Sequence, residues 1–332
     1  MSVIVLNYNG RHLLEACLSG VMHQTDIMYE VILVDNGSQD HSVDFVRKHF
    51  PEVRVVELPK NVGVAAGYNV GLRAAQGTYL VTLNNDAVPQ AGWLSALVAA
   101  VGTYPNVGSV ASLVCRADDP SMIDSAGICV DVTGSAWDRL GGYPLNASGT
   151  SVREVFGVSA AAALYCRTML DDVGLFAEHF FAYLEDVDLA WRSRLRGWTA
   201  VIAPRAVVVH EHSATSGEGS PFKLWHLGRN RIWCLIRNYP SPACWRFFFV
   251  IVGYDIAASV FQAVYCGTWQ PLRGRVNGLR AARRILQERS QMQAKRRIGW
   301  TSLVPYLNPL EGPQAVIRRY AYIKMRKQAM AR

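Results

Sequence analysis

The sequence predicts an α/β protein whose first part has a Rossmann-like, mostly parallel sheet. Short runs rich in β-branched residues alternate with helical patterns through the first half of the 332 residues. These runs show little polar–apolar alternation, which is typical of parallel strands covered by helices on both faces. Half of the residues are hydrophobic and 18% are charged, which excludes a disordered or low-complexity chain.

The first 90 residues are expected to hold four strands and three helices in alternation. The strands are 2–7, 30–35, 53–57 and 78–83, and the helices are 11–24, 40–50 and 64–75. Parallel strands open onto a ligand crevice at their carboxyl ends, so the polar residues there are candidate binding groups. Those ends read Asn7-Tyr8-Asn9, Asp35-Asn36-Gly37-Ser38 and Asn84-Asn85-Asp86.

Several common classes of protein are disfavoured. Asn7-Tyr8-Asn9-Gly10 follows the first strand where a dinucleotide-binding protein has Gly-x-Gly-x-x-Gly, and no P-loop motif occurs. The seven cysteines form no Cys-x-x-Cys pair, which predicts buried free thiols in a reducing compartment. The N-terminus runs into a strand without the pattern of a secretory signal, so the catalytic part is expected to face the cytoplasm.

The first candidate for chemistry is Asn84-Asn85-Asp86, which follows an apolar strand. A carboxylate in this place suits a divalent cation that arrives bound to a nucleotide diphosphate, since Mg²⁺ is usually held by one or two carboxylates plus substrate phosphates. An Asx turn explains the same residues without any ligand.

The second candidate is the pair Glu185-Asp186, which opens a helical apolar pattern that Gly197 closes. One interpretation makes Asp186 a helix N-cap that accepts hydrogen bonds from free amides. The other makes it a general base, because the same amides would keep its carboxylate ionised and oriented. Both hold at once if the cap is also the base.

The third candidate is the strand end Val209-His210-Glu211-His212, where His210 and His212 are expected on the same side. Two histidines on one face suit a metal ion. A solvated strand edge is the alternative.

The C-terminal third differs in charge from the rest of the chain. Residues 222–332 hold 20 Lys and Arg against 3 Asp and Glu, whereas residues 1–221 hold 14 against 23. Residues 245–265 are mainly apolar and carry Asp255 at their centre, which favours a helix or helical hairpin lying in a membrane interface over one that crosses. A helical packing or oligomerisation domain with a solvated basic face is the alternative. Nucleic-acid binding is disfavoured, because the apolar residues 245–265 would make no favourable contacts with a phosphate backbone.

In this order along residues 1–215, the motifs resemble the family 2 glycosyltransferases of GT-A fold, and among them the bacterial rhamnosyltransferase-like branch. The motifs that carry the likeness are Val3-Ile4-Val5-Leu6-Asn7-Tyr8-Asn9-Gly10, Val34-Asp35-Asn36-Gly37-Ser38, Asn61-Val62-Gly63, Gly67-Tyr68-Asn69-Val70-Gly71, Leu83-Asn84-Asn85-Asp86, 180–192 and Val209-His210. The likeness implies a glycosyltransferase domain at 1–215 and a basic amphipathic helical region at 216–332.

The resemblance also implies roles for individual residues. Asp186 would be the catalytic base and Glu185 an acceptor-binding neighbour, while Asp86 and His210 would hold Mg²⁺ or Mn²⁺. The residues implied in donor binding are Asn7, Tyr8, Asp35, Asn61, Asn69, Asn84 and Asn85. The first position of the Asp-x-Asp-like motif is Asn84, which leaves the cation with fewer anionic ligands.

The implied reaction is an inverting, metal-dependent transfer, most simply of rhamnose from dTDP-rhamnose, to a lipid-linked or growing polysaccharide in cell-envelope glycan biosynthesis. UDP-galactofuranose and UDP-N-acetylglucosamine are alternative donors, and a catalytically silent glycan-assembly scaffold is an alternative function. The implied location is the cytoplasmic face of the inner membrane, with peripheral or shallow attachment. A homo-oligomer is also compatible with the sequence.

Overall fold

The structure is a computed structural model of the chain, and it describes residues 1–25, 27–211 and 219–310. The chain divides into two compact units, Met1–Ile128 with Asp138–Thr215, and Cys129–Trp137 with Ser216–Arg332. Cys129–Trp137 groups with the second unit, although it lies between the two parts of the first unit in the sequence.

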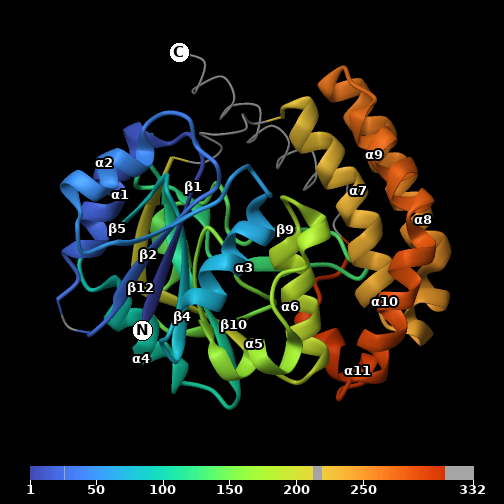
Figure 1. The fold of residues 1–332 in the computed structure, drawn as a ribbon. Helices are drawn as coiled ribbons and strands as arrows, with labels where there is room; N and C mark the ends of the chain where they lie inside the picture. The colour runs from blue at the N-terminus through green and yellow to red at the C-terminus, as the bar shows by residue number, and fades with distance from the viewer. Residues whose placement is uncertain (26, 212–218, 311–332) are drawn as a thin grey trace. The chain divides into compact units, whose positions relative to one another are not determined.

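The first unit is built on one mixed sheet with the strand order β10-β12-β6-β11-β4-β1-β2-β3, to which β5 and β7 are added on β12 and β6. Figure 1 shows these strands inside the unit with helices packed around them. Strands β4, β1, β2 and β3 are parallel, as expected for the first half of the chain. The strands are β1 (Ser2–Asn7), β2 (Glu30–Asp35), β3 (Arg54–Glu57), β4 (Tyr79–Asn84), β5 (Ala87–Pro89), β6 (Val107–Arg116), β7 (Ile123–Ser125), β10 (Arg153–Val155), β11 (Ala162–Cys166) and β12 (Thr199–His210).

The first three helices of the first unit agree with the expected ones to within two residues at each end. The helices of this unit are α1 (Arg11–Met22), α2 (Ser42–His49), α3 (Val64–Ala74), α4 (Trp93–Val101), α5 (Arg167–Val173) and α6 (Glu185–Leu195), with 3₁₀ turns η1 (Leu145–Ser148) and η2 (Glu178–Phe180). The central strand β1 is buried along its whole length, and Val3, Ile4 and Val5 are fully buried. A strand covered on both faces selects apolar residues at every position, which explains the missing alternation.

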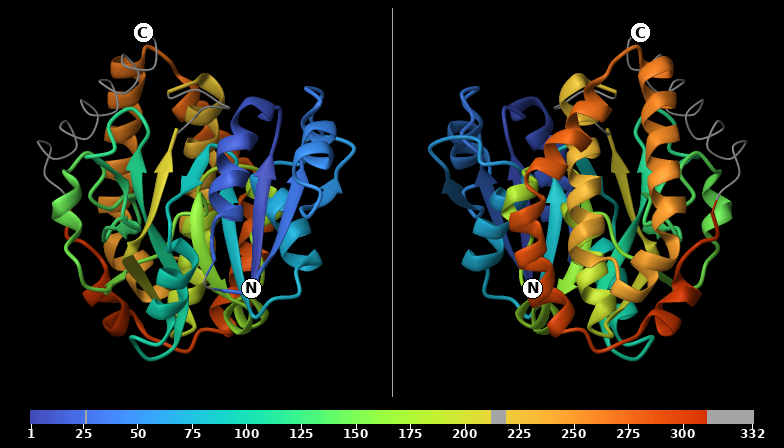
Figure 2. Two further views of the ribbon diagram at one scale, coloured as in Figure 1. Left: turned by 90° about the vertical axis from the view of Figure 1, so that its left-hand side faces the viewer. Right: turned by 90° about the vertical axis from the view of Figure 1, so that its right-hand side faces the viewer.

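The second unit is helical. It contains α7 (Pro221–Asn238), α8 (Ser241–Cys266), α9 (Gln270–Arg280), α10 (Ala282–Ala294), α11 (Trp300–Leu303) and the turn η3 (Val304–Tyr306). Helices α7 and α8 lie beside one another in the gold and orange part of Figure 2. The expected helical region is therefore present, and α8 includes all of residues 245–265.

The segment Cys129–Trp137 is attached to these helices by hydrogen bonds. Tyr239 Oη donates to Val132 O, Arg231 Nη2 donates to Thr133 O at 3.2 Å, and Asn308 N donates to Val130 O at 2.8 Å. The segment includes parts of two short strands, β8 (Ile128–Val130) and β9 (Ala136–Asp138), which pair with each other. These bonds explain why the segment groups with helices that follow it by about 90 residues.

Candidate active site

Three polar side chains meet where β1, β2 and β4 end. Asn7 Nδ2 donates to Asp35 Oδ1 at 2.9 Å, and Asn85 Nδ2 donates to Asn7 Oδ1 at 2.7 Å. All three residues are buried. The parallel pairing of β1 with both neighbours brings their carboxyl ends together, as the sequence analysis expects. Tyr8 follows Asn7 directly and is half-buried.

Gly10 is needed for this cluster to close. A Cβ atom at position 10 would lie 2.0 Å from Asn85 Nδ2 and 2.8 Å from Asn7 Oδ1. The glycine that ends the Asn7-Tyr8-Asn9-Gly10 motif therefore makes room for the Asn7–Asn85 hydrogen bond.

Asn61 is held close to the end of β2 through Asn36. Asn36 Nδ2 donates to Asn61 Oδ1 at 3.1 Å, and Val62 N donates to Asn36 Oδ1 at 2.9 Å. Asn36 was not among the residues assigned to the site from sequence, although the motif that contains it was identified. Its buried amide links the second strand to the loop before α3.

Asn69 and Asn84 are used inside the fold. Asn69 Nδ2 donates to Phe176 O at 2.8 Å and to Glu178 Oε1 at 3.0 Å, and Phe176 N donates to Asn69 Oδ1 at 3.0 Å. Asn84 Oδ1 accepts from Tyr68 Oη at 2.8 Å. The Asn69 amide is therefore bonded to the part of the chain that leads into α6.

Asp86 and His210 lie in contact. His210 Nε2 is 3.1 Å from Asp86 Oδ1, and His210 Nδ1 is 2.9 Å from Asp124 Oδ2. All three side chains are buried. Strand β6 pairs with both β12 and β7, so it places Asp124 of β7 beside the end of β12. His212, the other histidine expected at this strand end, lies outside the described residues.

The two carboxylates keep His210 protonated. Burial alone would lower the pKa of His210, but the charges of Asp86 and Asp124 and their hydrogen bonds raise it to about 10. Without a cation, Nδ1 donates to Asp124 and Nε2 donates to Asp86. A cation bound between His210 and Asp86 would replace the Nε2 proton, because a ligating imidazole nitrogen is unprotonated.

Asp86 and His210 fit a divalent cation. A carboxylate oxygen and an imidazole nitrogen face each other, and the second ring nitrogen is fixed by a carboxylate, which is the usual support of a metal-binding histidine. Within residues 1–25, 27–211 and 219–310, no group of three or more His, Cys, Asp or Glu is arranged as a metal site. Two protein ligands suit a cation that also binds donor phosphates.

The chain just before α6 has an uncommon backbone conformation. Phe181, Tyr183 and Leu184 have φ values of 65°, 70° and 63°, in the left-handed region that non-glycine residues rarely adopt. Leu184, and not Asp186, is the N-cap of α6, so the N-cap interpretation of Asp186 was wrong in position. Backbone strain of this kind is often found at functional sites.

Glu185 and Asp186 lie in the first turn of α6. Val187 N donates to Asp186 Oδ1 at 2.8 Å, and Ala160 N donates to Asp186 Oδ2 at 3.3 Å. Asp186 keeps part of its surface exposed, whereas Glu185 is buried. Asp188 is fully buried and bonds to Arg192 Nε at 2.8 Å, so it has a structural role.

Both carboxyl groups hold their protons more tightly than usual. Burial raises the pKa of Asp186 to about 6, with a smaller contribution from the charge of Asp138. Burial and the charge of Asp186 raise the pKa of Glu185 to about 8. Both groups are therefore weaker acids than free carboxyl groups, and the negative charge of either one disfavours ionisation of the other.

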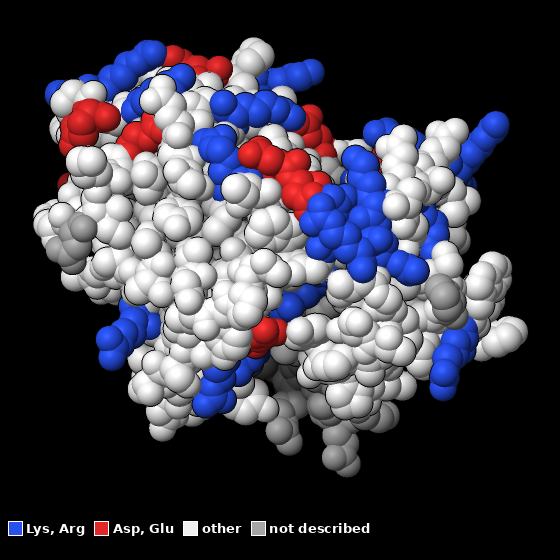
Figure 3. All heavy atoms as spheres, turned by 90° about the horizontal axis from the view of Figure 1, so that it is seen from below, with Lys and Arg blue, Asp and Glu red and all other residues white. Residues whose placement is uncertain are grey.

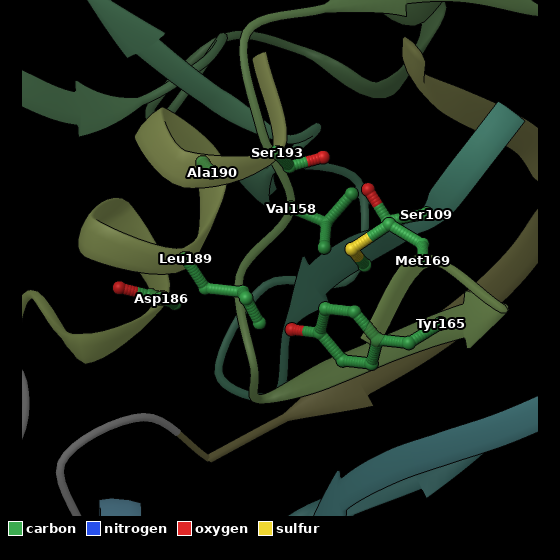
Figure 4. A pocket seen from close by; sticks show the side chains of 8 residues that line it. All are labelled: Ser109, Val158, Tyr165, Met169, Asp186, Leu189, Ala190 and Ser193. Carbon is green, nitrogen blue, oxygen red and sulfur yellow. The ribbon is translucent and has the colours of Figure 1, made fainter. Parts of the chain in front are cut away.

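A small cavity of about 10 Å³, enough for about one water molecule, lies beside Asp186. Figure 4 shows the hydroxyl group of Tyr165 pointing into it, while the carboxyl group of Asp186 points away. The other lining residues are Ser109, Val158, Met169, Leu189, Ala190 and Ser193. Asp186 therefore borders the cavity, but its carboxyl oxygens point out of it.

Tyr68 links the two acidic groups of the site. The charges of Asp86 and Glu185 both contribute to the raised pKa of Tyr68, of which burial is the main cause. The backbone supplies a second link, because Asp186 accepts from Ala160 N, and the neighbouring Ala161 O accepts from Asn84 N at 2.8 Å. The metal-binding candidates and the candidate base therefore belong to one neighbourhood.

The sequence analysis missed Asp124, whose only signal is an acidic residue in the run Ser121-Met122-Ile123-Asp124-Ser125. No spacing rule connects it to His210, because 86 residues separate the two.

Comparison with known proteins shows the family and the fold of the chain. The family model described as Glycosyl transferase family 2 matches residues 2–173. A curated relative, the N-acetylglucosaminyl-diphospho-decaprenol L-rhamnosyltransferase of Mycobacterium tuberculosis (strain CDC 1551 / Oshkosh), is 28% identical over 239 residues. The match covers 65% of this chain and 78% of the relative.

Solved structures share the fold. GalNAc-T7 with UDP, GalNAc and Mn²⁺ matches with a TM-score of 0.56 and 17% identity, over 70% of this chain and 47% of that one. The mannosyltransferase PcManGT from Pyrobaculum calidifontis, in complex with GDP-Man and Mn²⁺, matches with a TM-score of 0.52 and 20% identity, over 89% and 85%. At these identities the likeness concerns the fold.

Proposed function

The chain belongs to glycosyl transferase family 2 and has the GT-A fold, and from this premise we propose an inverting, metal-dependent sugar transfer to a lipid-linked or growing polysaccharide acceptor. The proposed donor is dTDP-rhamnose, from which rhamnose is transferred. The observation that carries the proposal is a short series of contacts between the two groups: Asn84, two residues before Asp86, donates its backbone N–H to Ala161 O, and the neighbouring Ala160 N donates to Asp186. Cell-envelope glycan biosynthesis is the setting that such an acceptor implies.

Asp186 acts as the general base in this proposal. It takes the proton of the acceptor hydroxyl as that oxygen attacks the anomeric carbon from the face opposite the diphosphate, so the configuration inverts. Its raised pKa, about 6, places its basicity near the working pH, and the amides of Ala160 and Val187 fix its orientation. General-base catalysis of this kind contributes about 10²–10⁴-fold.

Glu185 binds the acceptor in this proposal. Burial and the charge of Asp186 raise its pKa, which favours the protonated form, and its Oε2 atom is buried without a hydrogen-bond partner among the described residues. A protonated carboxyl group can donate a hydrogen bond to a sugar oxygen.

Asp86 and His210 would hold Mg²⁺ or Mn²⁺, and Asp124 would fix the orientation of His210. A divalent cation bound there supplies Lewis-acid stabilisation of the leaving diphosphate. The polar ends of β1 and β2, with Asn7, Asp35 and Asn61, provide donor-binding groups in the same proposal.

The name of the mycobacterial relative supports a rhamnosyl donor and a lipid-linked acceptor. UDP-galactofuranose and UDP-N-acetylglucosamine remain alternative donors, because the structural neighbours contain UDP and GDP-mannose on the same fold. Hydrolysis of a panel of nucleotide sugars tests the choice: we expect dTDP-rhamnose to be hydrolysed fastest. A preference for a UDP-sugar would contradict this donor while leaving the reaction class intact.

Asp186→Asn tests the mechanism. We expect kcat to fall by about 10²–10⁴-fold, while the dissociation constant for the donor nucleotide changes by less than about twofold. Asp171→Asn, at an exposed position of α5, is the matched control and should leave both values unchanged.

The Asp186→Asn variant also distinguishes an enzyme from the second candidate function, a catalytically silent scaffold. That function is favoured by Asn84, which stands in place of an acidic residue and is bonded to Tyr68. If the protein is a scaffold, neither it nor Asp186→Asn turns over any donor and acceptor, and both bind the nucleotide equally well.

A further inference from the structure

The side of α8 that faces away from α7 and α9 is apolar and exposed. The large side chains on it follow one another at steps of three or four residues, so they form a single stripe along the helix. They are Trp245 (78% exposed), Phe249 (85%), Val252 (38%), Ile256 (60%), Val260 (52%) and Val264 (79%). The stripe runs along a helix of 26 residues, about 39 Å long. Contiguous exposed apolar surface of this extent usually marks an interaction site.

Helix α9 also carries exposed apolar side chains. Gly267 ends α8, and after a short turn α9 begins and lies beside α8. Its exposed large side chains, with Trp269 just before it, are Trp269, Leu272, Val276 and Leu279. Together with the α8 stripe, these residues are called the apolar face below.

Basic residues are interspersed with the apolar face. Arg246 of α8, Arg273 and Arg280 of α9, and Arg283 and Arg284 of α10 are all exposed. In Figure 3, which views the molecule from below, Lys and Arg side chains gather beside broad areas without charged side chains. Exposed Trp together with Arg is typical of protein surfaces in the interfacial region of a membrane.

Asp255 does not interrupt the apolar face, because it lies on the opposite side of α8. It belongs to the buried stripe Ile251, Asp255, Ser259 and Ala263. Its Oδ1 atom accepts from Arg231 Nε of α7 at 2.7 Å and from Arg275 Nε of α9 at 3.2 Å. The negative charge of Asp255 is thus paired with two arginines inside the helical unit.

The same ion pairs oppose a crossing of the bilayer. α8 is long and apolar enough to span a membrane, and it is the one such helix among the described residues. Its inner side is bonded to α7 and α9, so a crossing would carry Arg231 and Arg275 into the hydrocarbon with it. Charges there are costly, whereas a helix that lies in the interface needs only one apolar side.

We propose that the apolar face lies flat in the interface of an anionic lipid bilayer, with α8 parallel to the membrane plane. This inference deepens the proposed function, since a lipid-linked acceptor would be met at such a surface. A second copy of this chain is the less suitable occupant. Pairing two apolar faces would bring the arginines of α9 and α10 of both copies together, whereas anionic lipids neutralise them.

Vesicle co-sedimentation of the full chain tests the proposal. The probes are vesicles of phosphatidylcholine alone and vesicles of phosphatidylcholine mixed with the anionic lipid phosphatidylglycerol, which attracts basic surfaces. We expect binding to the anionic vesicles, at least tenfold weaker binding to the neutral ones, and weakening by 0.5 M salt.

Phe249→Glu combined with Ile256→Glu should weaken binding to the anionic vesicles at least tenfold. Met28→Glu, at an apolar side chain of the first unit that is 92% exposed, is the matched control and should bind like the original protein. Thermal unfolding of all variants shows whether a loss of vesicle binding is caused by unfolding of the protein instead of a change in the apolar face. Equal binding by the double variant would overturn the proposal, as would a failure of the original protein to bind.

An alkaline carbonate wash distinguishes flat attachment from crossing. Release of the bound protein is expected, and retention in the vesicle pellet would overturn the flat placement. Light scattering tests the alternative that a second copy of the chain covers the apolar face. The proposal would also be overturned if the original protein is a dimer that does not bind vesicles and the double variant is a monomer. Donor hydrolysis is measured separately, so a protein that binds vesicles but hydrolyses no donor contradicts the proposed function alone.

Discussion

At the scale of single residues, the two halves of the candidate site differ in how their charges are balanced. The imidazolium of His210 is bonded to carboxylates on both sides. Glu185 has no such partner, and its Oε2 atom is buried without a hydrogen bond in the part of the chain that the structure describes. Because burial without a partner disfavours the charged form, burial and the charge of Asp186 raise the pKa of Glu185.

The raised pKa of Asp186 predicts an acid limb in the pH profile. The base must be ionised, so kcat/KM should fall about tenfold per pH unit below pH 6, because burial holds the pKa of Asp186 near 6. Asp138→Asn removes a charge that raises this pKa and should move the limb to lower pH. A limb near pH 4 in the unmodified protein would contradict the assignment of Asp186.

Asp124 should control how well His210 binds a cation. Asp124→Asn removes the carboxylate that fixes Nδ1, and we expect the affinity for Mn²⁺ in the presence of a nucleoside diphosphate to fall about 10–100-fold. Electron paramagnetic resonance of free Mn²⁺ measures this directly. Asp119→Asn, at an exposed residue near Asp124 in sequence, is the control; equal loss in both variants would refute a specific role for Asp124.

At the scale of elements, α7 and α9 pack closely because both carry glycine at the contact. A Cβ atom at Gly274 would lie 2.1 Å from Trp225 O, and one at Gly228 would lie 2.2 Å from Pro271 O. This close approach brings Arg275 of α9 and Arg231 of α7 onto the same oxygen of Asp255. The glycines therefore permit the ion pairs that fix the position of α8.

Gly274→Ala should destabilise the helical unit. The added methyl group has no room beside the backbone of α7, and overpacking of this kind costs about 1–3 kcal/mol. Gly253→Ala is the matched control, since nothing lies within 4 Å of a Cβ atom there, and this substitution should be neutral or stabilising by up to about 1 kcal/mol. Urea unfolding checks both values, and equal effects would contradict the close packing.

At the scale of the whole molecule, charge and chemistry are divided between the two units. Every residue proposed for catalysis, metal binding or donor binding lies in the first unit. The strongly basic part of the chain, including the apolar face, lies in the second. Cys129–Trp137 is the segment in which the division departs from chain order, because its partners Arg231, Tyr239 and Asn308 are all in the second unit.

Much of the first unit could be predicted from sequence because its signals are local. The strands Ser2–Asn7 and Glu30–Asp35 were predicted at their observed bounds, since a run of buried β-branched residues ends where a polar residue begins. The meeting of Asn7, Asp35 and Asn85 follows from parallel pairing, which fixes where strand ends lie. Asp86 and His210 were paired by family resemblance, and the structure brings them together.

The sequence by itself determined the fold class, the family, the central parallel strands and an apolar helix in a basic region, because each depends on residue type and short-range order. Only the tertiary structure decided that Asp124 supports His210, that Asn69 holds the chain before α6, and that Asp255 faces inward to two arginines. These are contacts between residues 20 to 109 positions apart. Such contacts depend on how strands and helices pack, and no periodicity or spacing along the chain encodes which distant side chains will meet.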